Sequence, residues 1–314
     1  METRLLPMLK TFRFPRLAFH DWRKHQLFEK FLREDLKVTK REYADSQQLK
    51  NACFDYDAYI SGSDQIWNTH CYDYDSAYFF DFITDGIKIA YAPSMGPRPE
   101  IEVGESYDSV IKQHLSTYNF ISVREDRTAD RVEHIIGKRP LVCLDPTLLL
   151  NQEDWYSMVD SVSCIQGDYI LLYTPLCDER MYEKAVKLAK EFNLKVVVTL
   201  PNHYFRYRKN RYMEFYTVVG PKEFLNLVRF SKFVICKSFH AVIFSLIFSR
   251  PFYAMDGMND SRIANLLNLT GLESFAKYPQ RSILELENDV FSSAFTSLEP
   301  AKDKSIKFLQ NALS

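Results

Sequence analysis

The chain has 314 residues, of which 46% are hydrophobic and 26% are charged. This composition excludes a disordered or fibrous protein. Because 40 basic side chains face 41 acidic ones, the formal net charge is −1, and no global positive field indicates a nucleic-acid partner. The length suits two domains that each bury a core.

The first predicted element is a helix over residues 17–34, for which apolar side chains at helical spacing predict a buried stripe of Phe19, Trp22, Leu27, Phe28, Phe31 and Leu32. A basic, aromatic amphipathic segment is also typical of helices that lie on anionic membranes. We favour packing on the protein's own sheet and keep peripheral membrane association open. No apolar run reaches membrane-spanning length.

Strands and helices then alternate along the first half of the chain. Short apolar runs predict strands at residues 58–60, 87–92, 120–123 and 141–144, with a helical region at 104–117. Such alternation indicates βα units and a mainly parallel sheet. We expect an N-terminal Rossmann-like domain at residues 1–150.

The same pattern restarts after Trp155. Predicted strands are residues 169–173, 195–200, 215–219, 232–236 and 251–255, and predicted helices are 178–193, 221–230, 239–248 and 261–269. We expect a C-terminal Rossmann-like domain at 151–300 and a helix at 301–314 that packs back on the first domain. The predicted fold class is α/β, with two such domains facing across a cleft.

Motifs for common cofactors are missing. There is no GxGxxG, P-loop or GxSxG pattern, and no cysteine or histidine spacing typical of a metal site. We therefore expect neither a metal nor a cofactor. The six scattered cysteines indicate reduced thiols in a cytoplasmic protein.

Three places carry polar side chains at predicted strand ends. In the first, a strand runs into Gly62, followed by Ser63, Asp64 and Gln65. Ligands of α/β sheets bind beyond the carboxyl ends of strands, and glycine lets the backbone approach a ligand closely. An ordinary turn with a capping Ser or Asp is the alternative.

Arg124, the second place, follows the strand at residues 120–123. Its guanidinium fits a carboxylate or phosphate bidentately. The alternative is a salt bridge to Glu125 or Asp126.

The third place is His240, at the start of an apolar helix with Lys237 and Ser238 beside it. Imidazole at a helix N-terminus suits proton transfer near neutral pH, while Lys237 and Ser238 offer a cation and a hydroxyl. The alternative is a histidine that caps its own helix.

Taken together, several segments resemble the polysaccharide pyruvyl transferase family, in the family's order. They cover roughly residues 50–272 and comprise Ile60-Ser-Gly-Ser-Asp-Gln-Ile-Trp67, Lys88-Ile-Ala-Tyr-Ala-Pro-Ser-Met-Gly96, Ile121-Ser-Val-Arg-Glu125, Leu144-Asp-Pro-Thr-Leu148, Gly220-Pro-Lys-Glu-Phe224, Lys237-Ser-Phe-His-Ala-Val-Ile-Phe-Ser245 and Asn259-Asp-Ser-Arg262. The resemblance implies a GT-B-like arrangement of two Rossmann-like domains, with phosphoenolpyruvate as donor substrate and a sugar as acceptor that becomes a pyruvate ketal.

Residue roles follow from the resemblance. Arg124 matches the Arg of S-x-R-[DE] and is expected in catalysis and donor binding, and His240 matches the His of S-F-H-G and is the expected acid/base. Lys237, Ser238 and Ser63 are expected to bind the donor. Side chains expected to line the acceptor cleft are Asp64, Gln65, Tyr91 and Ser94.

Three departures from the family pattern accompany these roles. Ala241 stands where the family usually has Gly, and Ser238 stands where some relatives have Arg, with Lys237 adjacent. The family's opening strand and its Asn/Gly turn are missing, so we expect either an upstream start or a trimmed first domain.

We therefore predict an enzyme that moves the enolpyruvyl group of phosphoenolpyruvate onto a sugar of a surface polysaccharide or its precursor. The acceptor is a sugar or a lipid-linked oligosaccharide, and the latter would place the cytoplasmic protein at the inner membrane face. The alternatives are a GT-B glycosyltransferase that uses a nucleotide sugar, and a degenerate family member that only binds sugar.

Overall fold

The computed structural model describes residues 15–99, 107–174, 178–200, 204–286 and 289–314. The chain forms two compact units. Unit 1 combines residues 1–40, 152–255 and 277–287, and unit 2 combines residues 41–151, 256–276 and 288–314. The C-terminal helix was expected to pack on the first domain, and residues 288–314 do belong to unit 2. The prediction did not include the placement of residues 1–40 in unit 1 or of residues 256–276 in unit 2.

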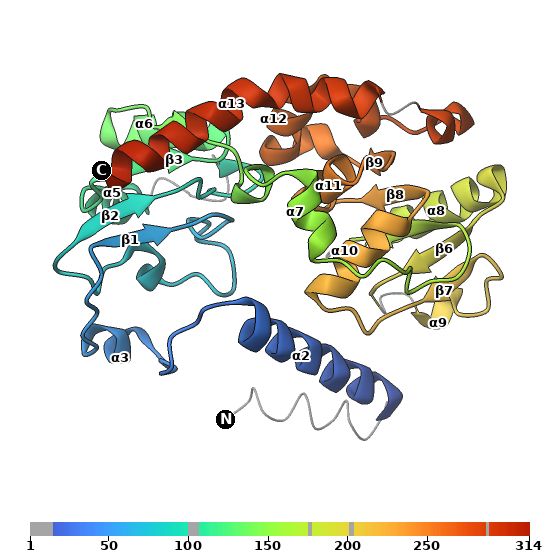
Figure 1. Cartoon of the computed structure of the whole chain (residues 1–314), viewed down its shortest axis with the longest axis horizontal. Coiled ribbons are helices and arrows are strands. Elements are labelled where there is room, and N and C mark those ends of the chain that lie inside the picture. Colours follow the sequence, from blue (N-terminus) through green and yellow to red (C-terminus); the bar gives the residue numbers. More distant parts are fainter. Residues whose placement is uncertain (1–14, 100–106, 175–177, 201–203, 287–288) are drawn as a thin grey trace. The chain divides into compact units, whose positions relative to one another are not determined.

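Unit 1 contains a five-stranded parallel sheet in the order β7-β6-β5-β8-β9 (Figure 1). The strands are β5 (Tyr169–Tyr173), β6 (Lys195–Val198), β7 (Met213–Phe215), β8 (Phe233–Cys236) and β9 (Phe252–Ala254). The strand predicted at 215–219 ends where we expected it to begin. Its neighbours lie within two residues of their predicted ranges.

Helices α8 (Glu179–Phe192), α10 (Pro221–Phe230) and α11 (Phe239–Ile247) complete this unit's layers. α8 packs on β5 and β6, and α11 packs on β8 and β9. Alternate strand residues such as Ile170 and Leu172 join the α8 core, while Leu171 between them is equally buried. Burial on both faces explains why these strands read as continuous apolar runs.

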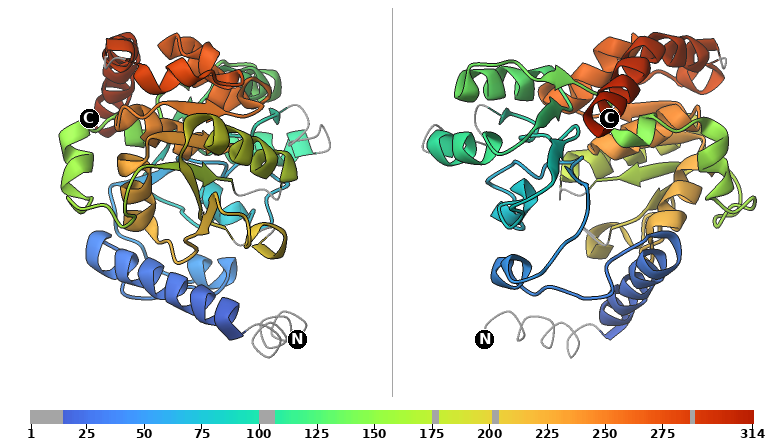
Figure 2. Two further views of the ribbon diagram at one scale, coloured as in Figure 1. Left: turned by 90° about the vertical axis from the view of Figure 1, so that its right-hand side faces the viewer. Right: turned by 60° about the vertical axis from the view of Figure 1, so that its left-hand side comes forward.

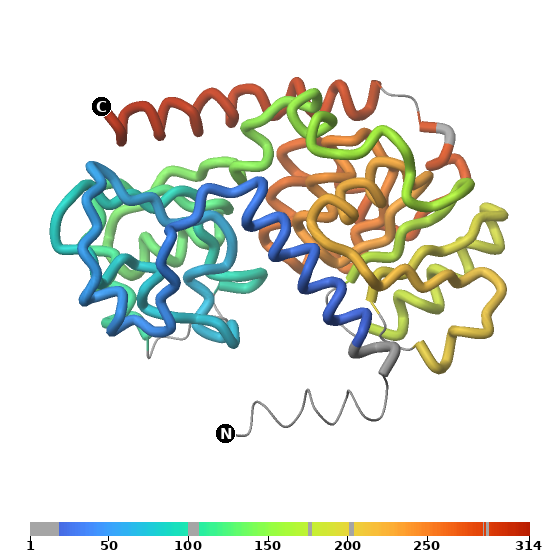
Figure 3. Tube along the Cα trace, turned by 60° about the horizontal axis from the view of Figure 1, so that its bottom comes forward, coloured from blue at the N-terminus to red at the C-terminus, as the bar shows by residue number. Residues whose placement is uncertain are grey.

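Helix α2 (Pro15–Asp35) packs against α10 (Figure 3). A Cβ on Gly220 would lie 2.6 Å from the Cβ of Leu27, so only glycine permits this approach. His20 Nδ1 lies 2.7 Å from Thr217 Oγ1, and Lys222 pairs with Asp35 at 2.8 Å.

The buried stripe that we predicted on this helix is only partly formed. Phe19, Trp22, Phe28 and Leu32 are 41–57% exposed, and only Leu27 and Phe31 are half-buried. Since α10 offers one narrow contact line, a helix face as wide as the predicted stripe has no partner there.

Unit 2 contains a four-stranded parallel sheet whose order follows the chain. The strands are β1 (Ala58–Ser61), β2 (Ile87–Ala90), β3 (Phe120–Val123) and β4 (Leu141–Val142). One face of this sheet shares a core with α5 (Asp108–Leu115) and α6 (Asp126–Ile136). Two further long helices of the unit are α12 (Ser261–Thr270) and α13 (Asp289–Leu313).

Helix α13 covers another part of unit 2. Phe308 and Leu309 pack on Tyr91 and Cys143, and the Ser305 hydroxyl accepts a 2.9 Å hydrogen bond from the Leu144 N–H. Figure 2 shows α13 beside α12, which it contacts. The helix begins twelve residues before the predicted start at 301 and contains Pro300.

The short elements are helices α3 (Ser46–Lys50), α7 (Gln152–Ser157) and α9 (Tyr204–Tyr207), and the 3-10 helices η2 (Ser76–Phe79), η4 (Pro146–Leu148), η5 (Gly257–Asn259), η6 (Glu273–Ala276) and η7 (Arg281–Glu285). Within the described ranges, no helix combines the length and the apolar character needed to cross a bilayer. The predicted α/β class with parallel sheets is confirmed.

Candidate functional site

The sheet of unit 1 reverses its strand order between β5 and β8. From β5 the chain adds β6 and β7 on one side, then returns to place β8 and β9 on the other. Ligands of open α/β sheets bind outside the carboxyl ends of the strands at such a switch point. The segments that follow β5 and β8 are therefore the best-placed part of unit 1 for a ligand.

A basic and acidic cluster occupies this switch point. Lys237, directly after β8, pairs with Asp178 at 2.6 Å, and both side chains are mostly buried. Asp178 caps α8, the helix after β5, and accepts hydrogen bonds from the backbone and guanidinium of Arg180. The hydrogen bonds from Arg180 hold the pKa of the Asp178 carboxyl well below its usual range, and Lys237 adds to the effect.

His240 lies in the first turn of α11, four residues after the end of β8. Its side chain is half-buried and lies beside the Phe239 ring. The Ser238 hydroxyl caps the helix by accepting from the Ala241 N–H at 3.4 Å. The imidazole, the cation and the hydroxyl expected from the sequence thus gather at one helix N-terminus.

In unit 2, β1 leads into the turn that carries Ser63, Asp64 and Gln65. Gly62 has a φ of +117°, and a Cβ there would overlap the Tyr91 carbonyl. Asp64 also has a left-handed φ, of 68°, and its carbonyl accepts from the Ser94 N–H at 2.8 Å. A non-glycine residue holds this conformation only where its surroundings fix it.

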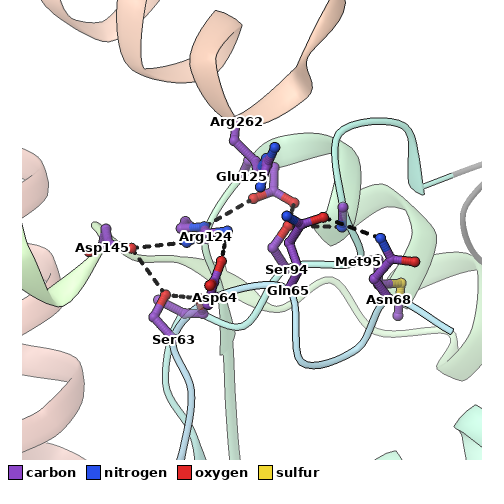
Figure 4. Close-up of polar contacts among 12 residues, drawn as sticks. Ser63, Asp64, Gln65, Asn68, Ser94, Met95, Arg124, Glu125, Asp145 and Arg262 are labelled. Atoms are coloured by element: carbon purple, nitrogen blue, oxygen red, sulfur yellow. Dashed lines mark hydrogen bonds and ion pairs between the residues drawn. The ribbon is translucent and has the colours of Figure 1, made fainter. Parts of the chain in front are cut away.

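The Arg124 side chain helps to hold Asp64 in this conformation (Figure 4). Its side chain is 1% exposed, and its two terminal nitrogens lie 3.0 Å from Asp145 Oδ2 and 3.3 Å from Asp64 Oδ1. Nε lies 3.7 Å from Glu125 Oε2. The sequence predicted a donor anion as the partner of this guanidinium, or a salt bridge to Glu125 or Asp126. In the structure its partners are the protein's own carboxylates, Glu125 among them.

Two of these carboxylates are tied to further groups. Glu125 is fully buried and accepts from Ser94 Oγ at 2.8 Å and from the Thr128 hydroxyl. Burial raises the pKa of Glu125, an effect that Arg124 opposes. Asp145 Oδ2 also accepts from Ser63 Oγ at 3.3 Å, so one buried carboxylate holds both Arg124 and the turn.

The other residues expected to line the acceptor cleft differ in exposure. The Asp64 side chain is 60% exposed, and Gln65 is half-buried and accepts from Asn68 at 3.2 Å. Tyr91 and Ser94 are buried: Tyr91 donates to the Leu144 carbonyl at 2.9 Å, and Ser94 donates to Glu125. Because both hydroxyls are buried and hydrogen-bonded within the protein, Tyr91 and Ser94 do not line a surface cleft as predicted.

The predicted residues therefore form two groups. Lys237, Ser238 and His240 lie at the start of α11 in unit 1. Unit 2 contains Ser63, Asp64, Gln65, Tyr91, Ser94 and Arg124. Sequence reasoning gave no role to Asp145 or Asp178. Asp145 directly follows a predicted strand and Asp178 begins a predicted helix, and these positions were the available signal. No set of three metal-ligating side chains gathers among the described residues.

Comparisons with known proteins agree with this architecture. A protein of Listeria monocytogenes assigned as a UDP-N-acetylglucosamine 2-epimerase is similar with a TM-score of 0.50 and 9% identity, over 95% of this chain and 80% of that one. The UDP-GlcNAc 2-epimerase of Methanocaldococcus jannaschii gives 0.45 and 10%, over 90% and 75%. At such identity the first match shows the fold alone. A comparison with curated proteins finds no match.

Family membership comes from the sequence. Residues 7–257 match the polysaccharide pyruvyl transferase family, and this range includes both groups of predicted side chains. The match also spans β1 to β9, so it covers the sheets of both units. The chain belongs to the polysaccharide pyruvyl transferase family.

Proposed function

We propose that this protein transfers the pyruvyl group of phosphoenolpyruvate to two hydroxyls of a sugar and forms a cyclic ketal. The observation that carries the proposal is the meeting of Lys237, Ser238 and His240 at the switch point of unit 1, in a chain of this family. A cation, a capped helix N-terminus and an imidazole are the groups that this reaction requires.

The donor carries a phosphate and a carboxylate, and both need positive partners. The N-termini of α8 and α11 follow neighbouring strands, and helix N-termini favour anions. The Lys237 ammonium adds a full charge. Because Asp178 holds Lys237 at 2.6 Å, a bound donor competes with this carboxylate for the ammonium, and Asp178 keeps the ammonium in position between turnovers.

The chemistry then needs protons moved at three places. His240, as imidazolium, gives a proton to the methylene carbon, which becomes a methyl group and leaves the neighbouring carbon electron-poor. One sugar hydroxyl attacks that carbon and returns its proton to the imidazole. The second hydroxyl attacks as the carbon–oxygen bond to phosphate breaks, and the phosphate departs with the second proton. The products are the ketal and inorganic phosphate.

In unit 2 we assign the acceptor to the turn. Asp64 carries the exposed carboxylate, an acceptor suited to sugar hydroxyls, and Gln65 stands beside it. Arg124 acts in this proposal through Asp64, because its guanidinium already has carboxylate partners. Arg124 is then a positioning residue for the acceptor, and donor binding falls to Lys237.

Membrane contact belongs to the same proposal, since a lipid-linked acceptor would hold the protein at the cytoplasmic membrane face. Helix α2 supports it with the exposed side chains of Phe19, Trp22, Phe28 and Leu32 and with basic Arg23 and Lys24. Flotation with anionic liposomes tests this part. We expect co-migration that Phe19→Ala with Trp22→Ala abolishes, and no co-migration of the unaltered chain would remove it.

Incubation with phosphoenolpyruvate and candidate glycans tests the function. Phosphate release together with the mass gain of a pyruvate ketal is the expected result. Lys237→Ala should weaken phosphoenolpyruvate binding, measured by calorimetry. The control is Lys232→Ala, which removes an exposed lysine directly before β8. Binding of UDP or GDP in preference to phosphoenolpyruvate would instead favour a nucleotide-sugar glycosyltransferase. Sugar binding without any turnover would favour a degenerate member.

A further inference from the structure

Unit 2 contains a cavity of about 690 Å³ beside the edge strand β4. Its walls come from β4, the start of α6, one face of α12 and the middle of α13, all within unit 2. The volume falls within the range of small-molecule sites. Arg124 belongs to the lining, and its guanidinium also pairs with Asp64 of the turn.

Three polar side chains in this cavity have unused hydrogen-bonding capacity. Asn265 and Asn268 lie one turn apart on α12, and Lys304 projects from α13. Within the part of the chain that the structure describes, none of the three makes a side-chain hydrogen bond or ion pair. A primary amide both donates and accepts, as a sugar hydroxyl does, whereas an ammonium only donates and favours an anion.

Both arginines of the lining already have carboxylate partners. Arg139 pairs with Asp126 at 3.0 Å, with Glu133 at 3.4 Å and with Asp130. Arg124 pairs with Asp145, Asp64 and Glu125. Lys304 is a cation of the lining that has no carboxylate partner among the described residues, so a single negative charge of a ligand is best placed beside its ammonium.

Apolar groups complete the lining. Leu141 of β4 and Leu269 of α12, which is 38% exposed, border the amides. A pyranose ring has an apolar C–H face and a hydroxyl rim, and this wall offers a surface for each. We propose that the cavity binds an acidic sugar unit, which carries a carboxylate or a phosphate near Lys304 and hydroxyls near Asn265 and Asn268.

This site extends the acceptor beyond the sugar that reacts. Its assignment to the acceptor rests on the proposed function, because the link runs through Arg124, which lines the cavity and pairs with the proposed acceptor residue Asp64. Binding of the acidic sugar itself does not depend on pyruvyl transfer.

Saturation-transfer NMR with the full chain tests the binding, with glucuronate, glucose 1-phosphate and glucose as probes. We expect the two charged sugars to bind more tightly than glucose, and the tighter of the two identifies the anionic group. Lys304→Ala should weaken that binding about tenfold, the loss expected of one hydrogen bond to a charged group. Asn265→Ala with Asn268→Ala should weaken all three probes.

Two control variants separate this site from its surroundings. Lys307→Ala removes the same charge from α13 outside this cavity and should leave binding unchanged. Lys237→Ala should lose phosphoenolpyruvate binding and keep glucuronate binding, so failure of the proposed function and failure of this site give different results. Equal binding of glucose and the charged sugars, or equal losses in Lys304→Ala and Lys307→Ala, would overturn the proposal.

Discussion

The two units are built from similar α/β repeats but differ in strand order and in the partners of the polar side chains that follow their strands. In unit 1 the strand order reverses between β5 and β8, and Lys237, Ser238 and His240 follow at that reversal. In unit 2 the described strands follow the order of the chain, and most polar side chains at their carboxyl ends bond to one another. The reversal in unit 1 separates the connections above the sheet, which is where ligands of open α/β sheets bind, whereas the polar side chains of unit 2 mainly hold the turn after β1.

His240→Ala should have the largest effect. Loss of a positioned general acid/base lowers turnover by about 10²–10⁴-fold, measured as phosphate release in the presence of an acceptor. His134→Ala, which removes an exposed histidine of α6, serves as the control. Full activity of the His240→Ala variant would show that unit 1 does not supply the acid/base of the reaction through His240.

Arg124→Ala should mainly destabilise unit 2. It leaves Asp145 and Glu125 buried without their cation, a change that costs about 3–5 kcal/mol. Arg139→Ala breaks exposed ion pairs on the same unit and should cost at most about 1 kcal/mol. Denaturant unfolding compares the two, and Asp145→Asn replaces Arg124→Ala if the latter does not fold. Equal losses at positions 124 and 139 would contradict the bracing role.

Gly220→Ala tests the packing of α2 in unit 1. The added Cβ collides with Leu27 and should destabilise the protein by about 1–3 kcal/mol, measured by denaturant unfolding. Leu27→Gly combined with Gly220→Ala should recover part of this loss, since Leu27→Gly removes the Cβ that the added methyl group would meet. If the loss of stability in the double variant equals or exceeds the sum of the losses in the two single variants, Gly220 and Leu27 are not in direct contact.

The smallest effect is a difference in pH dependence. The folded state raises the pKa of Glu125, so it binds more protons than the unfolded chain, and its stability falls as pH rises above the ordinary value of about 4.3. Asp178 has a lowered pKa, so its contribution is present above about pH 4 and is lost as pH falls further.

Unfolding free energies measured across this range should separate the two carboxyl groups. Glu125→Gln should flatten the decline above about pH 4, and Asp178→Asn should flatten the loss below it. Identical pH profiles of the two variants would show that neither carboxyl group titrates as its surroundings imply.

Much of the secondary structure could be predicted from the sequence because it depends on local hydrophobic periodicity. Strands β3, β5 and β8 and helices α8, α10 and α12 lie within one residue of their predicted ends. Their apolar runs and end signals act within a few residues. The predicted start of α13 was twelve residues late, and the missed part includes Pro300, a residue type that usually ends a helix but lies inside this one.

Partners distant in sequence were harder to predict. Nothing local indicated that Arg124 would face Asp145 and Asp64, or that Lys237 would face Asp178. The exposure of Phe19 and Trp22 was missed for the same reason, since a helical stripe does not reveal the width of the surface that receives it.

By itself, the sequence determined the α/β class, most strands and helices, the family, and the chemical types at Ser63, Asp64, Arg124, Lys237 and His240. These follow from short-range pattern and from residue identity. Only the tertiary structure decided that Arg124 is enclosed by carboxylates, that Tyr91 and Ser94 are buried, and that residues 256–276 belong to unit 2. Burial and ion pairing depend on which distant segments share a core, and no single stretch of chain encodes that choice.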